Sequence, residues 1–378
     1  MLVTRRRWLQ GTVGAVSLVL AAGTLVAIGP AQASPRVAGV REFDEPTGLA
    51  FGGGHLWVTN EAGNSVTEIN PSSGAWVNSF THNEGYLFSR PVAITQSGAD
   101  LFVANAGDSV SEMSTNNGKL VRVIKGAKYH FVSPVAITSS GNTILVLNAG
   151  HGASGSITEF NERTGSFMRT ISGSSFAFDN PAAFTVSGSD VFVADEGNNS
   201  MTEVNVANGA LVRVVAGQGL DAPDGIAVQS GEVWVADNAS SAATEITAAT
   251  GVPVSTFSDP AYGFWHPTAV IGTQGNVYVM TPLGTSPMVT KVSATDGTAD
   301  WYMCNTNGPY YFSLLSAFAV SGDNLWVASR SGANSTTPGA ATGSLTEMSI
   351  TSGDLIATFP APSSTTTTST TSTTTTTP

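Results

Sequence analysis

Residues 223–247 read PDGIAVQSGEVWVADNASSAATEIT and contain the pattern that repeats along this chain. Three apolar runs, IAV, VWV and TEI, are separated by polar turn residues. Triplets related to VWV occur seven times at intervals of 42 to 48 residues, with central residues Trp57, Phe102, Leu145, Phe192, Trp234, Tyr278 and Trp326. A period of this length predicts an architecture built from repeated units.

Each repeat predicts four short strands. A proline opens the first strand in six copies, and Ser316 stands in its place in the seventh; the prolines are Pro46, Pro91, Pro134, Pro181, Pro223 and Pro267. The third strand is TEI-like, and after a glycine turn the fourth reads like LVRV at 120–123. Four strands in about 45 residues are typical of a propeller blade. We therefore expect an all-β fold, a seven-bladed β-propeller of four-stranded antiparallel blades.

Composition supports this interpretation and excludes several classes of function. The 378 residues include 41 glycines, and only 11% are charged, which is too apolar for a disordered chain and too rich in glycine for a helical bundle. A net charge of −12, with one basic block at 5–7, argues against a nucleic-acid partner. The single Cys304 excludes an internal disulfide and zinc sites made of clustered cysteines.

The first 33 residues predict an export signal. Three arginines at 5–7 precede an apolar stretch at 13–28 and the small-residue exit Ala31-Gln32-Ala33. The string TRRRWLQ at 4–10 resembles a twin-arginine signal; an ordinary secretory signal and an uncleaved anchor are the alternatives. We expect a secreted or cell-surface monomer that has no stable membrane span after the signal is cleaved.

The remaining residues divide into a propeller and a tail. The propeller is expected over 34–362, and the Ser/Thr-rich residues 363–378 form a low-complexity tail that reads as a stalk or linker. Residues 40–43, VREF, resemble a fourth strand. They are predicted to close the ring by joining the seventh blade beside residues 354–359.

The motif PxxIAV at 223–228, followed by VWVAD at 233–237, resembles the NHL and YVTN class of propeller repeats. The resemblance covers about residues 36–360 and implies the fold more firmly than the function. This superfamily includes adhesion and sensor ectodomains, protein-binding modules, streptogramin B lyases and, more distantly, gluconolactonase-like enzymes.

Aromatic residues gather in the loops between successive repeats. The predicted ligand-binding residues are Tyr86, Phe88, Tyr129, Phe131, Phe264, Trp265, Tyr310 and Tyr311. Exposed rings there would stack on sugars or contact a protein, whereas the alternative is that the rings cover the ends of the blade interfaces. We expect a non-enzymatic binding or interaction propeller that presents this aromatic loop face to a protein or glycan at the cell surface, without a cofactor.

An enzymatic alternative rests on residues beside the entry prolines. A gluconolactonase-like site would hold one Ca²⁺ or Mg²⁺ ion on Glu45, Asn180 and Asp224. A lyase would use His266 and Glu45 as its catalytic pair. Either site would lie at the mouth of the central channel, although Arg90 there would oppose a cation.

Overall fold

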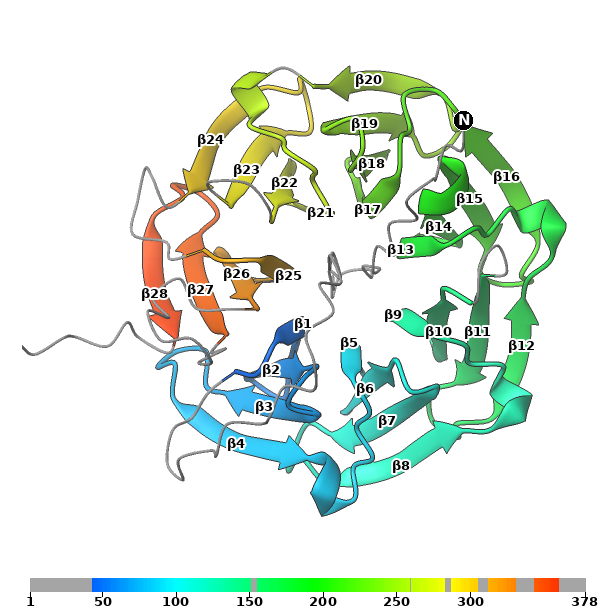
Figure 1. Cartoon of the computed structure of the whole chain (residues 1–378), viewed down its shortest axis with the longest axis vertical. Coiled ribbons are helices and arrows are strands. Elements are labelled where there is room, and N and C mark those ends of the chain that lie inside the picture. Colours follow the sequence, from blue (N-terminus) through cyan, green and yellow to red (C-terminus); the bar gives the residue numbers. More distant parts are fainter. Residues whose placement is uncertain are drawn as a thin grey trace, which may run out of the picture.

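Seven four-stranded antiparallel sheets surround a central axis, and each sheet is formed by consecutive strands (Figure 1). The computed structural model describes residues 43–150, 155–258, 260–282, 287–304, 312–330 and 343–359. The predicted export signal, the predicted tail and the loop with Tyr310 and Tyr311 lie outside these ranges. The expected seven-bladed propeller is confirmed.

The first strand of every blade is innermost and the fourth is outermost (Figure 1). The first strands are β1 (Pro46–Gly52), β5 (Pro91–Ser97), β9 (Pro134–Ser140), β13 (Pro181–Ser187), β17 (Pro223–Gln229), β21 (Ala269–Thr273) and β25 (Leu315–Ser321). The second strands are β2 (His55–Asn60), β6 (Asp100–Asn105), β10 (Thr143–Asn148), β14 (Asp190–Asp195), β18 (Glu232–Asp237), β22 (Asn276–Thr281) and β26 (Asn324–Ser329).

The outer half of each blade repeats in the same way. The third strands are β3 (Ser65–Ile69), β7 (Ser109–Ser114), β11 (Ser156–Asn161), β15 (Ser200–Asn205), β19 (Ala242–Thr247), β23 (Met288–Ser293) and β27 (Ser344–Ser349). The fourth strands are β4 (Trp76–Thr81), β8 (Leu120–Lys125), β12 (Phe167–Ile171), β16 (Leu211–Ala216), β20 (Pro253–Phe257), β24 (Ala299–Cys304) and β28 (Leu355–Phe359). The described connections contain five short 3₁₀ helices: η1 (His82–Glu84), η2 (Ala127–Tyr129), η3 (Ser174–Phe176), η4 (Glu196–Asn198) and η5 (Pro260–Tyr262).

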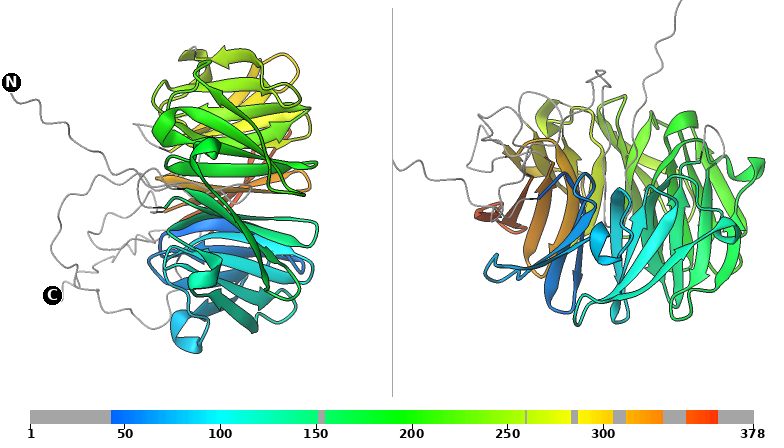
Figure 2. Two further views of the ribbon diagram at one scale, coloured as in Figure 1. Left: turned by 90° about the vertical axis from the view of Figure 1, so that its right-hand side faces the viewer. Right: turned by 60° about the horizontal axis from the view of Figure 1, so that its bottom comes forward.

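The side views show a short, broad cylinder with loops at both ends (Figure 2). Because the strands are antiparallel, the loops after the second and fourth strands of every blade emerge at the same end. We call this end the loop face. No helix within the described ranges is both long and apolar enough to cross a membrane.

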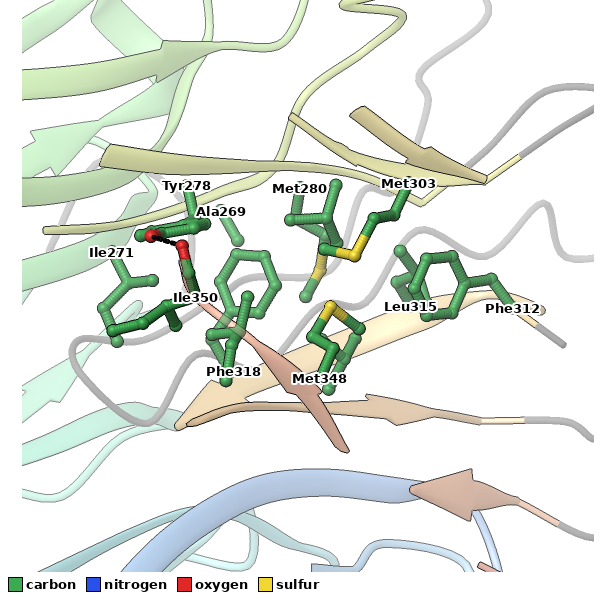
Figure 3. Close-up of a cluster of buried hydrophobic side chains, with 13 residues drawn as sticks. Ala269, Ile271, Tyr278, Met280, Met303, Phe312, Leu315, Phe318, Met348 and Ile350 are labelled. Atoms are coloured by element: carbon green, nitrogen blue, oxygen red, sulfur yellow. Dashed lines mark hydrogen bonds between the residues drawn. The ribbon is translucent and has the colours of Figure 1, made fainter. Parts of the chain in front are cut away.

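The core consists of side chains packed between neighbouring sheets. The triplet residues Trp57, Trp234 and Trp326 are at most 1% exposed to solvent. Figure 3 shows one such interface, where Tyr278 of blade 6 and Phe318 of blade 7 pack together and the Tyr278 hydroxyl donates to the Ile350 carbonyl at 3.0 Å. The period-two pattern thus buries both faces of each sheet, as predicted.

Residues 40–42 of the predicted closing strand lie outside the described ranges, and Phe43 pairs elsewhere than predicted. All four strands of blade 7 come from residues 315–359, and Phe43 forms a bridge with Gly343 instead of lying beside 354–359. The Phe43 ring packs 5.1 Å from that of Trp76. The Ser316 hydroxyl also donates to the Pro46 carbonyl at 2.7 Å, so blades 7 and 1 are joined by side chains and one bridge.

The third strands carry buried charges that are paired across the sheet. Arg122, Arg169 and Arg213 lie on fourth strands and contact Glu112, Glu159 and Glu203 at 2.5 to 2.9 Å. Blade 6 reverses the charges, because Lys291 contacts Asp300 at 2.8 Å. The guanidinium groups of these arginines also donate to turn carbonyls of the next blade, such as Arg169 to Val206 O at 2.5 Å. These contacts join the third and fourth strands of a blade and link the blade to the next one.

Candidate functional site at the channel mouth

Most of the aromatic loop residues are buried, which corrects the prediction of an exposed rim. The structure leaves Phe88, Tyr129, Phe131 and Phe264 at most 8% exposed, and Tyr86 is partly buried. These loops pass over the junction between two blades, and burial of the rings there removes a large apolar area from water. The rings therefore cover the ends of the blade interfaces, the alternative that the sequence left open.

The buried rings form stacked pairs with one hydrogen bond to the next blade. Tyr86 stacks on Phe88 and Tyr129 on Phe131, with centroids 5.4 and 5.5 Å apart. Tyr262 repeats the arrangement with Phe264. The tyrosine hydroxyls donate to turn carbonyls of the following blade, Tyr86 to Gly118, Tyr129 to Gly165 and Tyr262 to Gly297, at 2.6 to 2.9 Å.

Substituting Tyr129 with phenylalanine should lower the free energy of unfolding by about 1–2 kcal/mol, because the buried Gly165 carbonyl loses its donor while the ring stack is kept. Urea unfolding near pH 7 measures the change. Tyr129→Leu is the matched variant that also removes the stack and should cost more. Equal midpoints for Tyr129→Phe and the unaltered protein would contradict this contribution.

Trp265 is the exception among the loop rings. Its side chain is 59% exposed, and its ring meets that of His266 edge to face with centroids 5.4 Å apart. Exposure of a large apolar ring beside polar groups is typical of a contact residue in a binding site.

The channel mouth is built by a backbone feature that repeats in every blade. The residue before each entry proline, and Leu314 before β25, adopts a left-handed conformation, with φ between 46° and 54°; the six residues before prolines are Glu45, Arg90, Ser133, Asn180, Ala222 and His266. In blades 1 and 7 its carbonyl accepts the N–H of the residue that follows the second strand, Glu61 and Arg330 respectively. In each of these two blades, the bond holds the backbones of two residues at the mouth together.

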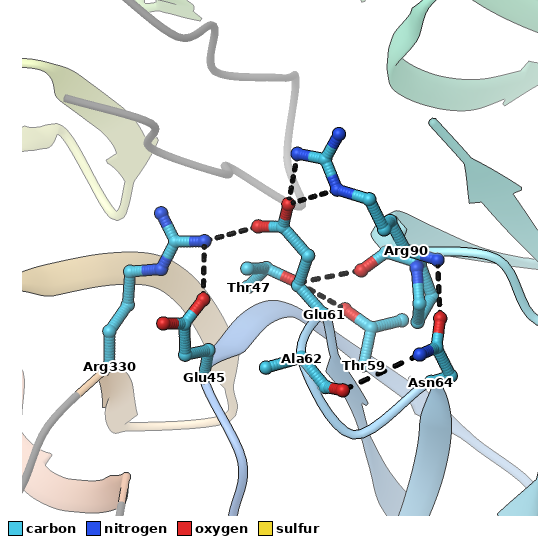
Figure 4. Close-up of polar contacts among 9 residues, drawn as sticks. Glu45, Thr47, Thr59, Glu61, Ala62, Asn64, Arg90 and Arg330 are labelled. Carbon is cyan, nitrogen blue, oxygen red and sulfur yellow. Dashed lines mark hydrogen bonds and ion pairs between the residues drawn. The ribbon is translucent and has the colours of Figure 1, made fainter. Parts of the chain in front are cut away.

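One side of the mouth is a charged network of Glu45, Glu61, Arg90 and Arg330, which we call the Arg–Glu network (Figure 4). Glu61 is 8% exposed and lies between two guanidinium groups. Arg90 Nη2 approaches Glu61 Oε1 at 2.5 Å, and Arg330 binds the other oxygen of Glu61 and reaches Glu45 at 3.4 Å. The network links blades 7, 1 and 2 and so adds to the closure of the ring.

A second group of polar residues, Asn180, Glu196, Asp224, Asn238 and His266, belongs to blades 4 to 6, and we call it the acidic sector. Asn180 Nδ2 donates to Glu196 Oε2 at 2.7 Å, and Asn238 Nδ2 donates to Asp224 Oδ2 at 3.3 Å. His266 Nδ1 lies 2.9 Å from the Asn238 carbonyl. Burial raises the pKa of Glu196, although the Asn180 hydrogen bond opposes this. Burial, and then the charge of Glu196, raise the pKa of Asp224 well above its usual range.

The structure divides the residues of the predicted metal and lyase sites between these two groups. Glu45 contacts Arg330, whereas Asn180, Asp224 and His266 belong to the acidic sector. Within the described ranges, no three His, Cys, Asp or Glu side chains are grouped in a way that could hold a metal ion.

The residues at the ends of the second strands bond to backbone N–H groups of the loop that precedes the blade. Asn105 and Asn148 accept backbone N–H groups and donate to Ser or Thr oxygens of the third strand, for example Asn148 Nδ2 to Thr158 Oγ1 at 3.1 Å. Asp195 and Asp237 occupy this buried position in blades 4 and 5. Burial raises the pKa of Asp237 to about 7 and that of Asp195 well above its usual range.

Sequence reasoning missed Glu61, Glu196, Asn238 and Arg330. All four directly follow a second strand, one residue after the capping position. Their only signal in the sequence was this shared offset from the repeated triplet. Because their side-chain types differ from blade to blade, no motif emerged.

The seven blades and their polar channel mouth define the protein as a seven-bladed β-propeller. A family model described as outer membrane protein assembly factor BamB matches residues 10–256. This match spans more than half of the chain, so the chain belongs to that family.

Solved structures with the same fold are distant in sequence. A computationally designed protein, Ika8, is 15% identical, covering 85% of this chain and 88% of its own, with a TM-score of 0.62. A streptogramin B lyase is 17% identical over 76% of this chain and 93% of its own, with a TM-score of 0.60. BamB from Moraxella catarrhalis is 14% identical over 80% and 83%, with a TM-score of 0.52. At these identities the likeness shows the fold alone. A search of curated proteins found no match.

Proposed function

We propose that the protein is an exported, non-catalytic binding module that holds a protein or glycan partner on its loop face. The observation that supports this most directly is the 59% exposure of Trp265 beside a mouth lined with charged and amide side chains. Tryptophan is among the residues that most often dominate binding energy, since it offers a large rigid area with one polar N–H. The family match to an assembly factor is consistent with a role in protein contacts.

Four further features belong to this proposal. The N-terminal signal would export the protein, and the Ser/Thr-rich tail would act as a stalk or linker. The repeats would belong to the NHL and YVTN class. The propeller would act as a monomer, because ring closure already buries the face of every blade.

Substituting Trp265 with alanine should weaken partner binding at least about tenfold, the loss expected when an interface anchor is removed. The purified exported protein is screened on a glycan array and a peptide-display library, and the strongest hit becomes the probe for calorimetry. Val254→Ala is the matched control, because Val254 is 52% exposed but lies on the outer strand β20. Equal affinity of Trp265→Ala and the unaltered protein would refute this binding face.

A metal-dependent lyase or lactonase is the weaker alternative. Both versions of that site need Glu45, whose carboxylate contacts Arg330, whereas the other residues belong to the acidic sector. A melting temperature that rises with Ca²⁺ or Mg²⁺, and no longer rises in Glu45→Ala, would favour the enzyme over the binding module.

A further inference from the structure

Asp224 is a buried carboxylate with an oxygen that lacks a hydrogen-bond donor. The residue is 6% exposed, its Oδ2 accepts Asn238 Nδ2 at 3.3 Å, and its Oδ1 has no hydrogen-bond partner. A buried acceptor left without a donor costs about 1–3 kcal/mol, and more when it is ionised. A donor on a bound ligand would remove this cost.

Two other blades place a hydroxyl at the position equivalent to Asp224, whereas blades 2, 3 and 4 place the apolar residues Val92, Val135 and Ala182 there. The second residue of the first strand is Thr47 in blade 1 and Ser316 in blade 7. Both hydroxyls donate to the carbonyl of the residue that opens the next blade's first strand, Pro91 and Pro46, at 2.9 and 2.7 Å. Compared with blades 1 and 7, Asp224 puts an acidic group where a hydroxyl donates, and its Oδ1 is left without a donor.

The surroundings of Asp224 are negative and rich in acceptors. Glu196 is near enough to raise the pKa of Asp224 by its charge. Asn180 and Asn238 use their amide N–H groups within the sector, and His266 Nδ1 contacts the Asn238 carbonyl. The arginines of the mouth that bind carboxylates, Arg90 and Arg330, are engaged with Glu61 in the Arg–Glu network.

We propose that the acidic sector binds a primary ammonium group of the ligand, with Asp224 and Glu196 as its counter-ions. An ammonium supplies three N–H donors and a compact charge, which match one free carboxylate oxygen and nearby acceptors. A guanidinium fits less well, because its paired donors favour two free oxygens of one carboxylate and Asn238 already occupies Oδ2. This inference rests on the proposed function, since the sector belongs to the same loop face as Trp265.

Calorimetry and saturation-transfer NMR near pH 7 test the proposal with small probes. Nα-acetyl-lysine methylamide is compared with its norleucine analogue, which has the same apolar stem and no ammonium. The lysine probe should bind at least tenfold more tightly. A second comparison uses glucosamine and N-acetylglucosamine, which lacks the ammonium. The pair with the larger difference in affinity shows whether the ammonium comes from a protein lysine or from an amino sugar.

Asp224→Asn should lower the affinity for the lysine probe at least tenfold. If that variant does not fold, Glu196→Gln serves in its place and should also lower the affinity. Asp237→Asn is the control, because it neutralises a buried carboxylate of the same blade outside the sector and should leave affinity within twofold. Equal binding of charged and uncharged probes, or unchanged affinity in Asp224→Asn, would overturn the site. Partner binding that depends on Trp265 but not on Asp224 would refute the ammonium site and leave the proposed function standing.

Discussion

Replacing Asp237 with asparagine is expected to stabilise the propeller at pH 8 by about 2–4 kcal/mol and to change its stability little at pH 4. Asp237 is fully buried at the end of β18, and burial raises its pKa to about 7. The Thr244 hydroxyl and the backbone of Asp221 favour the charged form but do not offset burial.

The direction of this pH dependence of stability follows from proton linkage. The folded protein holds the Asp237 proton up to about pH 7, whereas the unfolded chain releases it near pH 4. The stability that this proton contributes is complete below about pH 4 and is lost as the pH rises to about 7. Asparagine cannot ionise, and its amide can donate to the third strand as Asn148 does in blade 3.

Denaturant unfolding at pH 4 and pH 8 measures this effect, and the reverse substitution is its control. Asn148→Asp places a carboxylate in the equivalent buried position of blade 3 and should destabilise the protein at pH 8 more than at pH 4. Parallel pH profiles for Asp237→Asn and the unaltered protein would contradict the raised pKa.

Replacing Arg169 with alanine is expected to cost about 3–5 kcal/mol of stability, because it leaves the charge of Glu159 buried without a partner. Glu159 is 0% exposed, and Arg169 Nε contacts its Oε2 at 2.7 Å. The same guanidinium donates to Val206 of blade 4, so the substitution also removes a link between blades.

Two further variants separate these contributions in thermal and denaturant unfolding. The double variant Glu159→Met/Arg169→Met removes both charges and should recover most of the loss, since well-packed apolar residues replace buried ion pairs at little cost. Arg163→Ala removes the same charge from an exposed turn and should be nearly neutral. A loss as large in the double variant as in Arg169→Ala would show that packing, not the unpaired carboxylate, sets the cost.

The fold was predictable from the sequence because each unit encodes all of its own strands. The repeated triplet and the entry prolines place the first and second strands of six blades, and the period gives the number of blades. In the seventh blade, Leu315 takes the place of the proline and Ser316 is the second residue of the strand, which corrects the prediction for Ser316. The partner of Phe43 was predicted wrongly as residues 354–359, because pairing across the closure depends on three-dimensional position and the VREF pattern does not identify its partner.

The candidate site was predictable only in part. Asn180, Asp224 and His266 were expected at the mouth from their place beside the prolines, and they belong to one sector there. Contacts such as Arg330 with Glu61 join residues 269 positions apart, and only ring closure brings them together. The exposure of the loop aromatics was not predictable, because a ring that covers a blade interface and a ring that contacts a ligand have the same pattern in sequence.

Among the described strands, the four of each blade are consecutive in the chain, including those of blade 7, which Phe43 joins by a single bridge. Duplication or loss of one whole unit in the gene would therefore leave the hydrogen bonds within every remaining sheet intact. Such an event would alter only the number of blades and the curvature of the ring. A propeller whose final sheet shares strands from both ends of the chain does not have this freedom at its closure. The number of blades in this ring can therefore change by gene duplication, one blade at a time.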